Sequence, residues 1–467
     1  MASQVNVLIR RARIDGHIAD VRLAGDRVVQ IEKHVALKAG DRVIDADGGT
    51  LLPGLHDHHV HLLASAAAAE SVRCPDRAVG DTFLRVVRAA SDSSAPGVWL
   101  RVVNYHEDIA GHLNRRELDR IVADRPVRIQ HRGGSLWYLN SLGLAELLRT
   151  LEADDPAHAD PEVSAGRLWR RDYLLHGIER QFPPLERLGQ ELSSYGITGI
   201  TDATPDLGKS AAAYLVAAAR EGSIPSQLML LGTDNDGMRH QPRRVPRKII
   251  ISDHDLPGLD TVIDRIRRAR GAHRRAVAIH TVTRESLLLV LLAIQTVGVI
   301  AGDRLEHAAI TPPETFDVIR RLGLRVVTQP SFISQRGDTY LTEVEPADLP
   351  HLYRYASLRD AGIAVAPSSD APYGDLNPWR SIAAAVARKS ASGAVLGARE
   401  RVPYREALRG FLTHPLDPGG STRMVSVGGR ADLCLLRAPL EDVIASDDPN
   451  PVRATIGQGR IRFLSDH

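Results

Sequence analysis

Two histidines separated by one residue, His59 and His61, define the chemistry that this chain offers most plainly. They lie in the segment 53–61, which reads Pro-Gly-Leu-His-Asp-His-His-Val-His and follows a strand-like stretch. Side chains two residues apart in a strand share one face, about 6.6 Å apart. The imidazoles of His59 and His61 can therefore bind one metal ion at distances near ~2.1 Å. His56 and His58 would point to the opposite face.

Potential ligands also occur in four later segments that look like buried strands. In a barrel of parallel strands the active site lies at the carboxyl ends of the strands, so side chains far apart in sequence meet there. A single strand-end histidine is more often structural, but a set of five such side chains is hard to explain by packing alone. The sequence therefore predicts a metal site built from His59, His61, His280, His307 and Asp370, with Lys248 as a further candidate at the start of its strand.

The segments that must position these side chains alternate between apolar runs and helical patterns. Such repeats predict a parallel sheet covered on both faces, and about eight of them predict an α/β fold of the (β/α)8 TIM-barrel type. The expected helices include 261–270, 284–297 and 313–322. The expected strands after the first are 199–203, 227–232, 248–252, 276–280, 304–307, 325–329 and 363–368.

Both ends of the chain show short alternating segments typical of antiparallel strands. Neither end has enough strands for its own core, so we expect 1–55 and 418–467 to form one small composite β-sandwich domain. The barrel then spans 56–417. Residues from about 64 to 195 break the strand–helix rhythm and predict an insertion after the first barrel strand, forming a lid or a pocket wall.

The amino-acid composition limits the classes of function that this protein can have. The chain has 467 residues, 43% hydrophobic and 25% charged, which is ordinary for a globular protein. A net charge of +2 gives no case for a nucleic-acid partner. The longest apolar run, 286–302, is short for a membrane span and contains Gln295 and Thr296. Two cysteines, Cys74 and Cys434, without CxxC spacing suit a reducing compartment, so a cytoplasmic location is the expectation.

The motif set resembles the amidohydrolase superfamily, and within it amidohydrolase family 3, the branch that contains the N-substituted formamide deformylases. The resemblance extends over nearly the whole chain. It implies a metal-dependent hydrolase barrel with a β-sandwich from both termini, and ligand roles for the histidines and the aspartate named above. The matching motifs lie at 53–61, 136–141, 196–202, 278–280, 304–308, 369–372 and 428–433.

Lys248 is the position where the resemblance leaves alternatives. Many family members carry on the fourth strand a lysine that is carboxylated by CO2 and bridges two metals, and Lys248 matches it by order. The usual Asp-Gly after that strand is replaced here by Ser252-Asp253-His254-Asp255. Carboxylation needs a neutral amine, hence a desolvated position. Otherwise Lys248 merely begins a strand, and the site is mononuclear or uses Asp253 or His254.

The expected reaction is hydrolysis of an amide or N-formyl C–N bond (EC 3.5) by metal-activated water, with Zn²⁺ as the expected metal. Asp370 would take the proton from water and return it to the leaving nitrogen. The alternatives are a deaminase, a lactone or phosphoester hydrolase, or a non-catalytic metal-binding protein. Asp57 and Glu306 adjoin ligands, but strand alternation predicts that their side chains face away.

The expected partner is a small-molecule substrate, without nucleic acid or membrane; self-association is common in the family and leaves a homo-oligomer open. Aromatic residues make up only 4% of the chain, so the tryptophans of the insertion stand out. Arg336 follows the seventh strand, where it could bring a cation to a carboxylate. The predicted substrate-binding residues are Tyr105, His106, His131, Trp137, Trp169, Gln329 and Arg336.

Overall fold

The computed structural model describes residues 6–465 except 75–80, 96, 179–181, 234–244, 272–273 and 447. The chain forms two compact units, one from Met1–Leu62 with Leu185–His467 and the other from Leu63–Pro184. The second unit overlaps the predicted insertion of about 64–195, and α7 (Glu186–Ser194) belongs to the first unit. Within the described ranges, every helix is too short or too polar to cross a bilayer.

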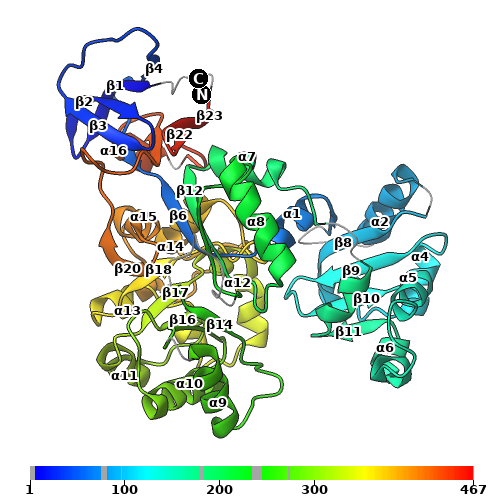
Figure 1. Cartoon of the computed structure of the whole chain (residues 1–467). Helices are drawn as coiled ribbons and strands as arrows, with labels where there is room; N and C mark the ends of the chain where they lie inside the picture. Colours follow the sequence, from blue (N-terminus) through cyan, green and yellow to red (C-terminus); the bar gives the residue numbers. More distant parts are fainter. Residues whose placement is uncertain are drawn as a thin grey trace. The chain divides into compact units, whose positions relative to one another are not determined.

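Eight strands of the first unit are parallel to their neighbours and lie in two sheets (Figure 1). Most residues of these strands are buried, as parallel strands covered by helices require. The first sheet has the order β13-β12-β6, with β6 (Leu55–Val60), β12 (Ile197–Asp202) and β13 (Gln227–Leu230). The second has the order β14 (Arg247–Ile249), β15 (Val277–Thr281), β16 (Arg304–His307), β17 (Arg325–Thr328) and β18 (Val365–Pro367).

A few backbone hydrogen bonds connect the two sheets at both ends of this order. The amide of Lys248 donates to the carbonyl of Leu231 at 2.9 Å, just beyond β13. At the other side the amide of Asp370 donates to His59 at 2.8 Å, and that of His61 donates to Ala371 at 2.9 Å. No strand ladder spans either junction in the described part of the chain. The architecture is thus a TIM-barrel-like α/β fold, less regular at these two junctions than the predicted barrel.

The helices that follow the strands have the boundaries that their sequences favour. In α10 (Arg284–Val297), which matches the predicted range, the Thr283 side chain accepts the Ser286 amide as an N-cap. Gly222, at φ 87°, ends α8 in the left-handed conformation that glycine adopts without strain. The predicted helix at 313–322 begins with a 3-10 turn. The main helices of this unit are α8 (Lys209–Glu221), α9 (Leu259–Arg270), α10, α11 (Phe316–Arg321), α12 (Ser331–Glu343), α14 (Pro378–Ala387) and α15 (Tyr404–Phe411).

Both termini contribute to a small β region of the first unit. One four-stranded sheet has the order β3-β2-β1-β4, from the N-terminal segment, and another has the order β23-β22-β21-β5. Buried side chains of both sheets, such as Val21 and Leu435, belong to one hydrophobic cluster. The strands are β1 (Val7–Ile14), β2 (His17–Ala24), β3 (Arg27–Glu32), β4 (Arg42–Asp45), β5 (Leu51–Pro53), β21 (Leu433–Leu436), β22 (Val452–Gly457) and β23 (Arg460–Leu464).

The second unit has its own five-stranded sheet with the order β11-β10-β9-β8-β7. Strands β8 and β9 are parallel neighbours, and Tyr105 on β8 is paired with His131 on β9. Apolar side chains from the strands and from α2 and α4 form its core. The elements are β7 (Val72–Arg73), α2 (Thr82–Ser93), β8 (Leu100–Tyr105), α3 (Glu107–Ala110), α4 (Arg115–Ile121), β9 (Val127–His131), β10 (Leu136–Leu139), α5 (Ser141–Leu148) and β11 (Arg167–Trp169).

Candidate metal centre

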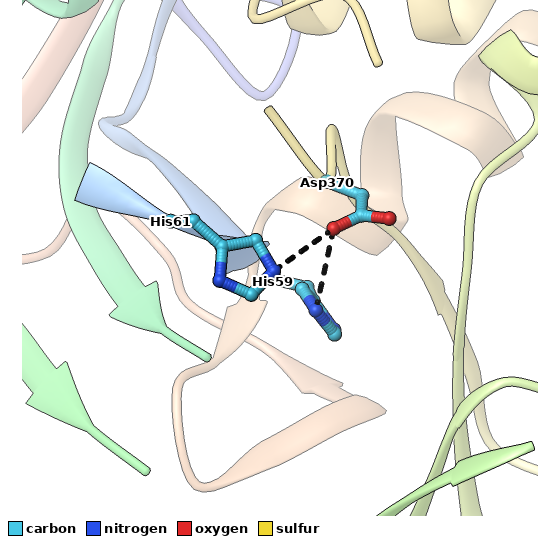
Figure 2. A group of neighbouring side chains, drawn as sticks. All are labelled: His59, His61 and Asp370. Atoms are coloured by element: carbon cyan, nitrogen blue, oxygen red, sulfur yellow. Dashed lines mark ion pairs between the residues drawn. The ribbon is translucent and has the colours of Figure 1, made fainter. Parts of the chain in front are cut away.

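Three of the predicted ligands meet at the carboxyl ends of β6 and β18. Figure 2 shows the imidazoles of His59 and His61 directed at one oxygen of the Asp370 carboxylate. The Nε2 atoms lie 3.5 Å and 3.3 Å from Oδ1, respectively. Donor atoms around a tetrahedral zinc ion with bonds of ~2.05 Å are about 3.3 Å apart, so this spacing suits one shared cation. His59 is fully buried and the His61 side chain is 13% exposed, so the position borders a solvent path.

Asp370 Oδ1 is a buried oxygen that accepts no hydrogen bond from the described residues. A buried carboxylate oxygen without a donor is costly unless a cation satisfies it. Burial raises the pKa of Asp370, but the neighbouring His59, His61 and His307 lower it by more, so the carboxyl is ionised at neutral pH. This oxygen is the observation that best fits a metal ligand.

The tautomer of His59 is also that of a metal ligand. His59 donates from Nδ1 to Glu306, and the Nδ1 atom of His61 lies 3.3 Å from the hydroxyl of Thr204. With the proton of His59 on Nδ1, its Nε2 keeps a lone pair on the side of Asp370. Burial lowers the pKa of His59 well below its usual value, so the imidazole is neutral as a ligand must be.

The contact between His59 and Glu306 contradicts the prediction that the Glu306 side chain faces away from the site. Glu306 is fully buried and also accepts a hydrogen bond from Arg304 at 2.5 Å. Alternation would put Glu306 and His307 on opposite faces, but the backbone of His307 is left-handed with φ 69°. That turn breaks the alternation, and both side chains reach the same region.

Lys248 reaches the centre instead of remaining at the far end of the barrel. Its side chain is buried, and Nζ lies 3.4 Å from Nε2 of His59. The strand β14 has only three residues, so a lysine in its middle lies close to its carboxyl end. Burial lowers the pKa of Lys248 to about 8, which raises the fraction of neutral amine at neutral pH. The position meets the desolvation requirement set out for a carboxylated lysine.

His307 and His280 extend the cluster along the strand ends. The ring of His307 lies 4.8 Å from that of His59 and 4.5 Å from that of His280, between centroids. Nδ1 of His307 is 3.7 Å from Asp370 Oδ2. Nε2 of His280 is 3.8 Å from the carboxylate of Asp253. The five predicted ligands and Lys248 are therefore gathered in one cluster.

The two alternatives to Lys248 lie at different places. The Asp253 carboxylate is beside His280 and accepts a hydrogen bond from the Thr283 hydroxyl at 2.8 Å, so it holds the loop after β15. His254 is exposed. Of these two, only Asp253 is near the predicted ligands.

The remaining histidines of the 53–61 segment point elsewhere. Nε2 of His56 lies 2.8 Å from the Thr201 hydroxyl, and Nε2 of His58 lies 3.0 Å from the Thr413 hydroxyl. Both rings are fully buried, and burial lowers the pKa of His58 to about 3. Asp57 accepts the amide protons of His59 and Ser369, which ties β6 to the end of β18.

The predicted substrate residues are placed in several environments. Gln329 is buried, and its amide oxygen accepts from Nδ1 of His307 at 2.9 Å while its amide nitrogen donates to Ser368 at 2.9 Å, so it orients the His307 ring. Arg336, on α12, stacks on the Phe332 ring at 4.1 Å and donates to the Tyr373 carbonyl at 2.6 Å.

The other five lie in the second unit. Tyr105 and Trp137 are buried in its hydrophobic clusters, where they pack against apolar neighbours. Trp169 is 41% exposed. His106 and His131 lie beside one another, with ring centroids 5.3 Å apart.

Sequence reasoning missed the roles of Glu306 and Gln329 as partners of ligating histidines. A signal was present in the segment Arg304-Leu305-Glu306-His307, because an arginine two residues from a glutamate on a buried strand indicates a paired carboxylate. The role of Gln329 had no such signal, since its partner His307 lies on another strand.

Comparison with known proteins shows which family this chain belongs to. A model described as the amidohydrolase family, family 3, matches residues 42–463. The chain therefore belongs to the amidohydrolase family, as the motifs predicted. This membership makes it a hydrolase by class. The N-substituted formamide deformylase of Arthrobacter pascens is 27% identical over 95% of this chain and 94% of its own length.

Solved structures share the fold. An uncharacterized metal-dependent hydrolase from Pyrococcus horikoshii OT3 superposes with a TM-score of 0.70 at 18% identity, covering 95% of this chain and 98% of that protein. One from Pyrococcus furiosus has a TM-score of 0.68 at 20% identity, covering 95% and 99%. At these identities the similarity shows the fold alone.

Proposed function

We propose that this protein is a metal-dependent hydrolase that cleaves a C–N bond of the amide or N-formyl type in a small molecule. The observation that carries the proposal is the Asp370 carboxylate, whose buried Oδ1 lies between the Nε2 atoms of His59 and His61 without a hydrogen-bond donor. The family and the formamide deformylase from Arthrobacter pascens support C–N hydrolysis.

His59, His61, His280, His307 and Asp370 would hold the metal, for which we propose Zn²⁺ because imidazole and carboxylate donors suit it. A divalent cation bound here would supply Lewis acidity toward the carbonyl and would lower the pKa of bound water to about 7. Glu306 and Gln329 fix the tautomers of His59 and His307, so both rings are oriented before a metal binds. Asp370 accepts the proton of the attacking water and returns it to the leaving nitrogen.

Lys248, with Nζ beside His59, is proposed to be carboxylated and to bridge a second metal ion. In that case the site is binuclear, with Asp370 on one ion and Lys248 shared by two. We further propose that the eight strands form the predicted (β/α)8 barrel and that the two terminal sheets form its composite β-sandwich.

A substrate panel with metal analysis tests the function. Purified protein is expected to contain metal, to hydrolyse at least one member of a panel of amides and N-formyl amines, to lose this activity with a chelator, and to recover it with Zn²⁺ or Mn²⁺. Hydrolysis of lactones, phosphoesters or amino-purines alone would move the protein to one of the alternative reactions. Metal binding without turnover of any of these classes would support a binding protein instead.

A further inference from the structure

A second cluster of potential ligands lies in the unit Leu63–Pro184. His106 directly follows β8, Glu107 begins α3, and His131 ends β9. Because β8 and β9 are parallel neighbours, their carboxyl ends bring these residues together. The three ligand atoms lie within 4.8 Å of one another. The unit thus gathers two imidazoles and one carboxylate without any residue of the barrel.

The spacing of the donor atoms suits a single divalent cation. Oε2 of Glu107 lies 3.1 Å from Nε2 of His131 and 3.8 Å from Nε2 of His106. These values lie on either side of the separation of about 3.3 Å that a tetrahedral zinc site needs. The three side chains are 12–25% exposed, so a cation can enter from solvent.

Two of the ligands have partners that orient them. The Tyr138 hydroxyl donates to Oε1 of Glu107 at 2.8 Å, which leaves Oε2 directed at the histidines. The Asp108 carboxylate lies 2.9 Å from Nδ1 of His106, and the Asp108 amide donates to the same nitrogen at 3.3 Å, so Asp108 holds the ring in place.

A cation that binds to His131 must displace existing hydrogen bonds of its ring. The Gly133 amide donates to its Nδ1 at 3.0 Å, so the proton of the ring lies on Nε2 and is donated to Glu107. Binding of a metal at Nε2 moves that proton to Nδ1 and releases the Gly133 amide, which lies in an exposed turn. A cation at this position therefore replaces the hydrogen bond between Nε2 of His131 and Glu107.

We infer that His106, Glu107 and His131 form a second metal site, selective for a divalent cation of the zinc type, that is separate from the metal centre of the barrel. Two histidines and one carboxylate are a ligand set that zinc uses, and three protein ligands leave one position for water or another donor. The inference does not depend on the proposed function, because no barrel residue takes part.

Metal titration of the full chain tests this site with Zn²⁺ alone as the probe. The background is the double variant His59→Ala/His61→Ala, which disables the barrel centre. Equilibrium dialysis followed by elemental analysis is expected to find one zinc per chain in this background and none after the further change Glu107→Gln. His112→Gln is the matched control, because His112 is 88% exposed beside Glu107 but outside the ligand set, and zinc should be retained.

A second variant covers the case in which Glu107→Gln disturbs folding. Tyr138→Phe keeps the ring and removes only the hydroxyl, and should raise the Kd for zinc by about 10–100-fold. Unchanged zinc content in Glu107→Gln, or an unchanged Kd in Tyr138→Phe, would overturn the site. So would the absence of zinc from the His59→Ala/His61→Ala protein with a native circular dichroism spectrum.

Discussion

The barrel centre and the His106–Glu107–His131 cluster are built in the same way, but they differ in how far apart their contributing strands lie. Both use side chains at the carboxyl ends of parallel strands. The barrel draws its ligands from strands as far apart as β6 and β18, whereas the cluster uses two adjacent strands, β8 and β9. The barrel ligands are mostly buried, whereas those of the cluster are partly exposed.

This difference predicts that the two sites bind a metal with different affinity. The proposed barrel ligands come from several strands, and some have a buried partner of their own, such as Glu306 for His59 and Gln329 for His307. The cluster depends on one short segment, 106–108, and on the hydroxyl of Tyr138. Preorganised, buried ligands bind a metal more tightly than exposed ones that must first lose a proton.

The largest effect is expected from Asp370→Asn. Removing the ionised carboxylate removes the proposed base, so kcat should fall by about 10²–10⁴-fold on whichever amide or N-formyl substrate the protein hydrolyses. Zinc content should stay, since an amide oxygen and the histidines remain. A variant that keeps most of its kcat would contradict the role of Asp370. Glu107→Gln is the comparison in the other cluster, and its kcat should not change if that cluster serves a separate purpose.

Lys248→Ala tests the number of ions in the barrel. In a Glu107→Gln background, where only the barrel binds, removal of the proposed bridge should reduce bound zinc from two equivalents to one, by elemental analysis. The structural reason is the position of Nζ at 3.4 Å from His59. Unchanged zinc content would return Lys248 to a structural role and leave a mononuclear site.

Glu306→Gln compares the partner of a barrel ligand with Tyr138→Phe in the cluster. An amide can still contact His59 but no longer attracts its Nδ1 proton as a carboxylate does, so the Kd for zinc at the barrel should rise by about 10–100-fold. Asp303→Asn is the control, because Asp303 is a buried carboxylate just before the same strand, paired with Arg270. That variant should lose stability and retain zinc affinity; equal losses in both variants would show a general folding effect.

The reactivity of the two cysteine thiols measures the unfolding of each unit separately. We expect this to be the smallest of the effects. Burial raises the pKa of Cys74, in the second unit, to about 12, and also raises that of Cys434, in the first unit. At pH 8 the thiolate fraction of Cys74 is on the order of 10⁻⁴, so neither thiol should react with iodoacetamide in the folded protein.

As urea is added, Cys74 should become reactive before Cys434, because a smaller unit buries a smaller fraction of its surface. Mass spectrometry of labelled peptides gives the order. Labelling of Cys434 first would reverse the expected ranking of the two units.

Much of the barrel could be predicted from sequence because many of its strands carry apolar residues and have polar residues at their carboxyl ends. The predicted segments 304–307 and 284–297 coincide with β16 and α10. The ligands could be predicted for the same reason, since the carboxyl ends of parallel strands meet wherever the strands lie in the sequence.

The sequence by itself determined which residue types are available and that His59, His61 and Asp370 end buried strands. Only the tertiary structure decided which neighbours orient them. Left-handed backbone at His307 and Asp370, with φ of 69° and 53°, turns adjacent side chains toward one place, and strand alternation cannot predict this. The contact between Glu306 and His59 joins residues on different strands, and the His106–His131 contact likewise depends on the register of two strands. Register and backbone turns are set by the packing of the whole unit, so they are absent from local sequence patterns.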